Sequence, residues 1–181
     1  LESITFGASV KELESSAFFG CKSLKEIATP ESLIQIGQSA FQGCESMTKA
    51  TLSNNLEYID DYAFMSCKSL ESMSIPSSVT YINTAAFYGC ESLAEIVFED
   101  GSERVSLNEP FTKCSNIQYL YVGRNLQMGN TSKYHFMSDK SGIPTLKTLV
   151  VGDSVTAIQR DTYASSYGLK NVTLGSSLKT I

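Results

Sequence analysis

The residues best suited to chemistry in this sequence are five cysteines that recur at nearly constant spacing. Four of them lie in the similar segments AFFGCKSL, AFQGCESM, AFMSCKSL and AFYGCESL, and the series runs Cys21, Cys44, Cys67, Cys90 and Cys114. Cysteine thiolates bind zinc, form disulfides and act as nucleophiles. The spacing of the five residues decides which of these roles fits.

Steps of 23 or 24 residues do not suit a metal centre. Zinc ligands come in close pairs such as C-x2-C, usually with histidine, whereas this chain has one histidine and no such pair. We expect no metal and no cofactor. Disulfides between neighbouring repeats remain open, because stacked strands lie about 4.8 Å apart and the Cα atoms of a disulfide approach that closely. Parallel Cβ vectors disfavour such bridges, and an odd number of cysteines leaves at least one thiol free.

A ladder in the core is the simplest interpretation of the cysteines. In the seventh repeat Ser166 takes the cysteine position and Tyr163 the phenylalanine position, so a small residue without thiol chemistry is accepted there. Buried cysteine behaves as a small hydrophobic residue. The same pattern predicts a companion ladder made of Phe18, Phe41, Phe64, Phe87 and Phe111.

The elements that position these residues follow the same period. Each repeat begins with a hexapeptide whose fourth and sixth positions are mostly apolar, which predicts a strand with one buried face. A turn, a second short apolar pair and the AF segment follow, and we expect the last to form a single helical turn. The hexapeptides are LESITF, LKEIAT, MTKATL, LESMSI, LAEIVF, IQYLYV, LKTLVV and LKNVTL.

A unit of 23 residues cannot bury its own apolar face, so neighbouring units must stack as parallel strands into a solenoid with one continuous core. About seven and a half repeats fill residues 1–181 as a single domain, with a longer sixth repeat and an insertion near residues 127–145. Because neither end carries a cap, we expect the chain to be a fragment of a longer array.

The repeat consensus LxxIxIPxSVTxIxxxAFxxCxSL, nearly complete from Leu70 to Leu93, resembles the BspA-like leucine-rich repeat. The resemblance covers essentially the whole chain. It implies a right-handed leucine-rich-repeat superhelix with a parallel β-sheet on its concave face and short helical turns on its convex side. It also implies a secreted or cell-surface protein used for adhesion, with no catalytic residues to carry over.

Composition excludes some classes of function. A net charge of −5 disfavours a nonspecific nucleic-acid binder, which needs a positive field. No apolar run is long enough to span a membrane, and the N-terminal residues lack the features of a signal peptide. The chain has no phosphate-binding glycine motif and no nucleophile elbow. We therefore expect no nucleic acid, no direct membrane insertion and no enzyme.

One region of the predicted surface is rich in tyrosine. Tyr119 and Tyr121 fall on the exposed face of the sixth hexapeptide, beside Val97 and Val150 of the adjoining repeats, and the insertion adds Tyr134 and His135. Tyrosine is enriched in binding hot spots, and insertions in repeat arrays form loops that often carry function. These six residues are the candidate binding site, although paired tyrosines also simply cover strands.

The first hypothesis for function is a non-enzymatic adhesion module that binds a protein or glycoprotein, such as a component of the host extracellular matrix. The second is a structural spacer, or stalk, in a larger surface protein. A third and remote alternative is a carbohydrate-active enzyme, which needs two carboxylates about 5–10 Å apart in a cleft.

Overall fold

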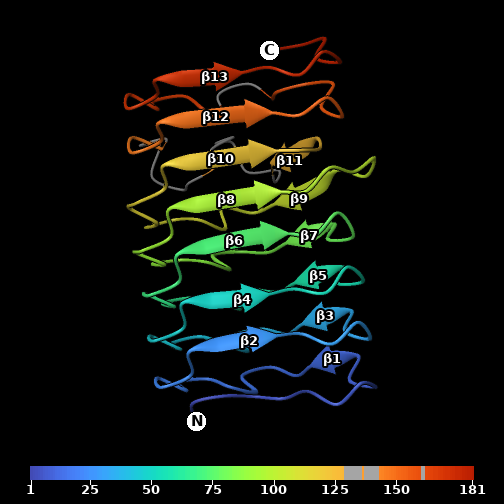
Figure 1. Ribbon diagram of the computed structural model, residues 1–181, viewed down its shortest axis with the longest axis vertical. Helices are drawn as coiled ribbons and strands as arrows, with labels where there is room; N and C mark the ends of the chain where they lie inside the picture. The colour runs from blue at the N-terminus through green and yellow to red at the C-terminus, as the bar shows by residue number, and fades with distance from the viewer. Residues whose placement is uncertain (129–135, 137–142, 160–161) are drawn as a thin grey trace.

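The computed structural model describes residues 1–128, 136, 143–159 and 162–181. Within them the chain forms thirteen short strands, which stack as successive coils along one long axis (Figure 1). Every strand pair is parallel. The chain is therefore a parallel β-solenoid, as the repeat period predicts.

The hexapeptides supply the first layer of strands. Seven of the eight contain a strand, and residues 1–6 contain none. Burial alternates along six of these strands, as in the exposed–buried–exposed–buried pattern of Ser72–Ile75, whereas Asn171–Thr173 is exposed throughout. The hydrogen-bonded ladder is interrupted between the second and third strands of this layer. The first layer therefore consists of two sheets. One is the pair β2 (Glu26–Ala28) and β4 (Lys49–Thr51), and the other is a five-stranded sheet of β6 (Ser72–Ile75), β8 (Glu95–Phe98), β10 (Tyr119–Val122), β12 (Thr148–Val151) and β13 (Asn171–Thr173).

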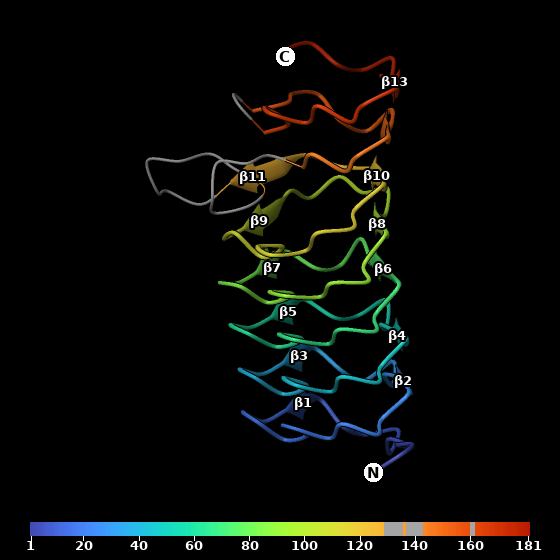
Figure 2. The ribbon, with the colours of Figure 1, turned by 90° about the vertical axis from the view of Figure 1, so that its left-hand side faces the viewer.

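A second sheet of six strands lies on another side of the coils, and our single-sheet prediction missed it (Figure 2). It is built from the segments around the second apolar pair of the first six repeats. Several of its strands are only two residues long, which is too short to show an alternating pattern in the sequence. In order along the sheet they are β1 (Glu12–Leu13), β3 (Gln35–Ile36), β5 (Tyr58–Ile59), β7 (Tyr81–Ile82), β9 (Val105–Leu107) and β11 (Leu126–Met128).

The AF segments form turns, and the expected helical turns are absent from the described part of the chain. In the first repeat the Phe18 N–H donates to the Ala40 carbonyl of the next coil at 2.8 Å, so it is not available to a helix. Ser16 and Gly20, four residues apart, take left-handed φ angles of 60° and 69°. Glycine adopts such angles without cost, whereas they interrupt a right-handed helix.

Aromatic and thiol side chains stack along the axis inside the coils. The Phe64 ring, for example, lies parallel to Phe41 at 5.3 Å and to Phe87 at 5.2 Å between centroids. The stack begins at Phe18, which is half-buried, and Phe136 continues it at 4.8 Å beyond Phe111. One continuous core therefore runs the length of the stack, built by each coil from a similar set of leucine, isoleucine, phenylalanine and cysteine residues.

A buried arginine ties together coils that are not direct neighbours. Arg124 is fully buried, and its guanidinium donates to the carbonyls of Ser77 at 2.5 Å and Pro76 at 2.7 Å, 47 and 48 residues earlier. Gly101 of the intervening coil lies against this arginine: a Cβ there would meet the Arg124 Cδ at 3.5 Å, an ordinary van der Waals contact, and would crowd the Ser77 Cβ at 3.2 Å. Loss of solvation lowers the pKa of Arg124 to about 10.

Candidate functional site

Two of the three predicted site tyrosines, Tyr119 and Tyr121, lie in β10, the central strand of the five-stranded sheet. Tyr121 is the register partner of Val97 in β8 and of Val150 in β12, so an apolar residue flanks it on both sides. Tyr119 lies between Glu95 and Thr148 instead. We call Val97, Tyr119, Tyr121 and Val150 the β10 surface; all four are partly exposed.

A hydrogen bond holds one of these rings in place. The Tyr121 hydroxyl donates to Asp100 Oδ1 at 2.8 Å. This bond is the largest cause of a raised pKa at Tyr121, and partial loss of solvation is the second. Gly152 makes the arrangement possible, because a Cβ at that position would lie 2.7 Å from the Tyr121 hydroxyl and 3.0 Å from Asp100 Oδ1. The β10 surface thus presents a tyrosine whose orientation is fixed before any partner arrives.

Two of the predicted binding residues, Tyr134 and His135, lie outside the described residues, as does most of the insertion near residues 127–145. Their neighbour Phe136 is described and is buried in the phenylalanine stack. The structure therefore brings together four of the six predicted site residues.

The cysteines lie in the core as free thiols. Cys44, Cys67, Cys90 and Cys114 are buried, and Cys21 is partly exposed. Each buried thiol donates to the carbonyl of a ladder phenylalanine in the preceding coil, as Cys67 does to Phe41 at 3.3 Å. Burial raises the pKa of Cys44 to about 11 and raises those of Cys67 and Cys90 further. These three thiols are thereby held in the protonated, unreactive form.

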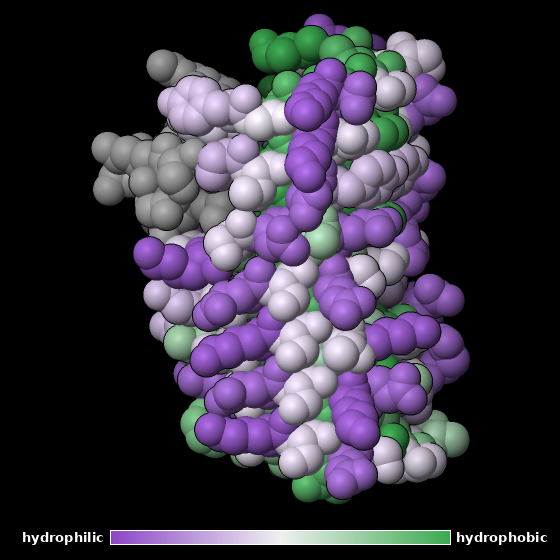
Figure 3. All heavy atoms as spheres, turned by 60° about the vertical axis from the view of Figure 1, so that its left-hand side comes forward, coloured by the Kyte–Doolittle hydropathy of each residue, from purple (hydrophilic) through white to green (hydrophobic). Residues whose placement is uncertain are grey.

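Charges on the side where the first-layer strands begin form columns along the long axis (Figure 3). One repeat position carries Lys22, Glu45, Lys68 and Glu91 in alternation, and Lys22 and Glu45 pair at 3.0 Å. That ion pair lowers the pKa of Glu45. Among the described residues no group of histidine, cysteine and acidic side chains could hold a metal ion.

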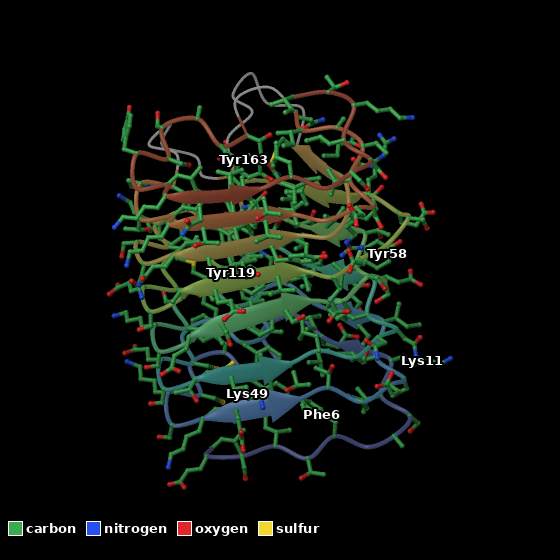
Figure 4. The ribbon with its side chains drawn as sticks, turned by 45° about the horizontal axis from the view of Figure 1, so that its top comes forward. Phe6, Lys11, Lys49, Tyr58, Tyr119 and Tyr163 are labelled. Atoms are coloured by element: carbon green, nitrogen blue, oxygen red, sulfur yellow. The ribbon has the colours of Figure 1, made fainter. Side chains whose placement is uncertain are left out.

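A second pair of tyrosines, which the sequence analysis did not single out, lies on the six-stranded sheet. Tyr58 and Tyr81 are 36% and 48% exposed, and their rings stack at 5.6 Å with an interplanar angle of 11°. The signal was available in the segments EYI and TYI, which place tyrosine directly before the last residue of the second apolar pair in successive repeats. Tyr58 and Tyr119 lie on different sides of the stack (Figure 4).

These stacked parallel coils, with a repeated core of leucine, phenylalanine and cysteine, define a leucine-rich-repeat protein. Six copies of the family model described as BspA type Leucine rich repeat region match residues 1–118 and 131–181. The chain therefore belongs to this family, which confirms the resemblance found in the sequence. It is a family of repeat proteins and not a known enzyme family.

Two solved structures are similar to the chain in fold. A leucine-rich repeat protein from Bacteroides ovatus gives a TM-score of 0.62 at 22% identity, and the match covers 100% of this chain but 62% of that one. A leucine-rich repeat protein of T. pallidum gives 0.57 at 21% identity, covering 98% and 72%. A comparison with curated proteins finds no match. None of the described residues forms a helix long and apolar enough to cross a membrane.

Proposed function

We propose that the chain is a non-enzymatic, adhesion-type binding module of a cell-surface or secreted protein, and that it binds a protein or glycoprotein partner through the β10 surface. The observation that supports this most is the placement of Tyr119 and Tyr121 at the centre of the five-stranded sheet, with Val97 and Val150 on either side of Tyr121. Membership of a family of surface repeat proteins supports the location.

The β10 surface has the features of a binding hot spot. Tyrosine supplies a large amphipathic contact area, and hot spots concentrate such residues in a few central positions. The hydrogen bond from Tyr121 to Asp100 fixes the ring, so little side-chain freedom is lost when a partner binds. The polar neighbours of Tyr119, Glu95 and Thr148, would form part of the rim.

The repeats themselves supply a matched variant for the test. Thr148 and Val150 occupy in β12 the positions that Tyr119 and Tyr121 occupy in β10. The double variant Tyr119→Thr/Tyr121→Val therefore removes both rings and introduces only residue types that this sheet already carries. We expect it to keep the fold, which circular dichroism and urea unfolding would verify.

The experiment measures binding of the chain to immobilised extracellular-matrix and plasma proteins, a class that includes candidate host partners. We expect the wild type to bind at least one of them and the double variant to lose more than about tenfold in affinity, the effect of removing one hot-spot residue or more. A Tyr58→Ser/Tyr81→Ser variant, altered on the other sheet, serves as the control. Binding that survives in the β10 variant would place the site elsewhere, and a wild type that binds nothing would favour a spacer.

A further inference from the structure

A groove of about 310 Å³ lies at the edge of the five-stranded sheet where β10, β12 and β13 begin. Figure 3 shows this side of the molecule, with the last coils at the top. Three successive coils line the groove through equivalent positions, on either side of the apolar residue that opens each repeat. We call it the lysine groove, and these lining residues are Asn116 and Gln118, Thr145 and Lys147, and Gly168 and Lys170.

The two lysines of the groove belong to neighbouring coils. The Lys170 N–H donates to the Lys147 carbonyl at 2.9 Å, and the Lys147 N–H donates to the Gln118 carbonyl at 2.9 Å, so the coils follow one another about 4.8 Å apart. Both lysines are exposed. Lys147 Nζ donates to Gln118 Oε1 at 2.6 Å, which is an uncharged partner. Within the described residues neither lysine forms an ion pair, so both positive charges stay available to a ligand.

The charge of this edge changes sharply along the long axis. Segments 115–119, 144–148 and 167–171 contain the two groove lysines and no acidic residue. The preceding coil, in segment 91–95, contains Glu91 and Glu95 and no lysine. Glu95 is a register partner of Tyr119 and is therefore two coils, or roughly 10 Å, from the coil of Lys147. The groove is thus a small positive site on a chain whose net charge is −5.

The lysine groove adjoins the β10 surface. Gln118 directly precedes Tyr119, and Lys147 directly precedes Thr148, the register partner of Tyr119. At the far end of the groove, a side chain in place of Gly168 would collide with a backbone carbonyl oxygen, so this end carries no side chain that could fill it. A segment that covers the β10 surface can therefore extend into the groove without a break.

We propose that the lysine groove binds a short acidic segment of the partner protein. An aspartate or glutamate side chain interacts with Lys147 and Lys170, and neighbouring apolar side chains of the same segment contact Tyr119 and Val150. This inference rests on the proposed function, because the groove supplies the charged part of a site whose aromatic part is the β10 surface. Complementary charge of this kind fixes the register and orientation of a bound segment.

The position of the negative charges selects a short segment over a long polyanion. A sulfated polysaccharide that ran along the long axis would leave the two lysines after a short distance and meet Glu91 and Glu95, which repel it. A segment with one or two carboxylates beside apolar residues meets only the lysines and the β10 surface. The groove therefore suits an acidic and apolar peptide.

The test uses a fluorescein-labelled glycine–serine peptide whose central motif is two aspartates followed by leucine and phenylalanine. Matched peptides carry two asparagines or two lysines in place of the aspartates. Binding to the intact chain is measured by fluorescence anisotropy at low and raised concentrations of NaCl. We expect the aspartate peptide to bind about threefold to tenfold more tightly than the asparagine peptide, the effect of one or two exposed ion pairs, and this advantage to shrink as NaCl is added. The lysine peptide should bind more weakly than the aspartate peptide, although the net charge of the chain would favour it if the attraction were nonspecific.

Two variants separate the groove from the tyrosines. Lys147→Gln/Lys170→Gln introduces the residue that Gln118 provides at the same repeat position, and it should bind the aspartate and asparagine peptides equally. Tyr119→Thr/Tyr121→Val should weaken the binding of both peptides and keep the preference for aspartate. Circular dichroism would verify that both variants keep the fold.

A control removes the same charge elsewhere. Lys11 and Lys25 lie in the first two coils, outside both the lysine groove and the β10 surface, and Lys25 occupies the repeat position of Lys147. The variant Lys11→Gln/Lys25→Gln should therefore bind all three peptides as the wild type does.

Several outcomes would overturn the proposal. They are the absence of binding of the aspartate peptide to the wild type, equal affinity for the aspartate and asparagine peptides, and a preference for aspartate that survives in the Lys147/Lys170 variant. An equal loss in the Lys11/Lys25 control would also overturn it, as would tighter lysine-dependent binding of a heparin oligosaccharide than of the peptide. A lysine-dependent preference with no effect of the Tyr119/Tyr121 variant would support the groove and contradict the proposed role of the β10 surface, whereas binding that depends on the tyrosines alone would do the reverse.

Discussion

Replacing Phe64 with alanine tests the idea that the phenylalanine stack is the central support of the fold. Phe64 is fully buried, and a neighbouring ring stacks on each of its faces at 5.3 and 5.2 Å. A phenylalanine side chain buries about 200 Å² of surface, which at about 25 cal/mol per Å² corresponds to about 5 kcal/mol. Alanine loses most of this burial and leaves a cavity between two rings, so we expect a loss of about 4–5 kcal/mol in the free energy of unfolding.

Urea unfolding followed by circular dichroism measures this loss, and two further variants locate its cause. Phe64→Leu keeps most of the volume and should cost about 1–2 kcal/mol. Phe18→Ala should cost about half as much as Phe64→Ala, because Phe18 is only partly buried and has a parallel ring, Phe41, on one face alone. Equal costs for the two alanine variants, or a loss below about 1 kcal/mol for Phe64→Ala, would refute the reasoning.

Three shorter tests address other features. Iodoacetamide should label Cys21 in the native protein and spare the four buried cysteines, as read by mass spectrometry; equal labelling of all five would contradict their burial. Gly152→Ala should displace the Tyr121 hydroxyl, which would lie 2.7 Å from the new Cβ, and lower the free energy of unfolding by about 0.5–1.5 kcal/mol, the worth of its hydrogen bond to Asp100; Gly7→Ala, with only a 4.0 Å contact, should be nearly neutral. For Arg124, the pKa in the folded state lies below the unfolded value, so the free energy of unfolding rises as the pH rises through the folded pKa. Relative to Arg124→Met, the wild type should gain on the order of 1 kcal/mol between pH 8 and pH 10.5, and a constant difference in urea unfolding would contradict this.

The sequence predicts the strands of the first layer and the core residues because each repeat restates the same alternating pattern, and seven of eight hexapeptides do contain strands. It does not predict the second sheet, since a pair such as Tyr58–Ile59 is too short to show a period. The helical turns were wrong because residue type alone does not reveal that the Phe18 amide bonds to the next coil.

For the candidate site, the sequence predicts which side chains lie on the outer face and which residues adjoin them, but it does not predict their hydrogen bonds. The alternation places Tyr119 and Tyr121 on the outer face of their strand, and the fixed period places valines beside Tyr121. The hydrogen bond from Tyr121 to Asp100 depends on how the turns fold back, and no repeat position encodes it. The Tyr58–Tyr81 pair was missed because the second apolar segment had not been assigned to a strand whose exposed face could be examined.

The tie made by Arg124 changes how the stack is expected to open. In a solenoid whose coils contact only their direct neighbours, terminal coils can detach one at a time, and protection from hydrogen exchange falls off gradually toward each end. The hydrogen bonds from Arg124 to Ser77 and Pro76 span the coil that contains Gly101, so that coil cannot separate from either neighbour while they persist. Three consecutive coils in the middle of the chain therefore form one cooperative unit, which divides a nominally uniform array into a stable centre and more readily opened flanks.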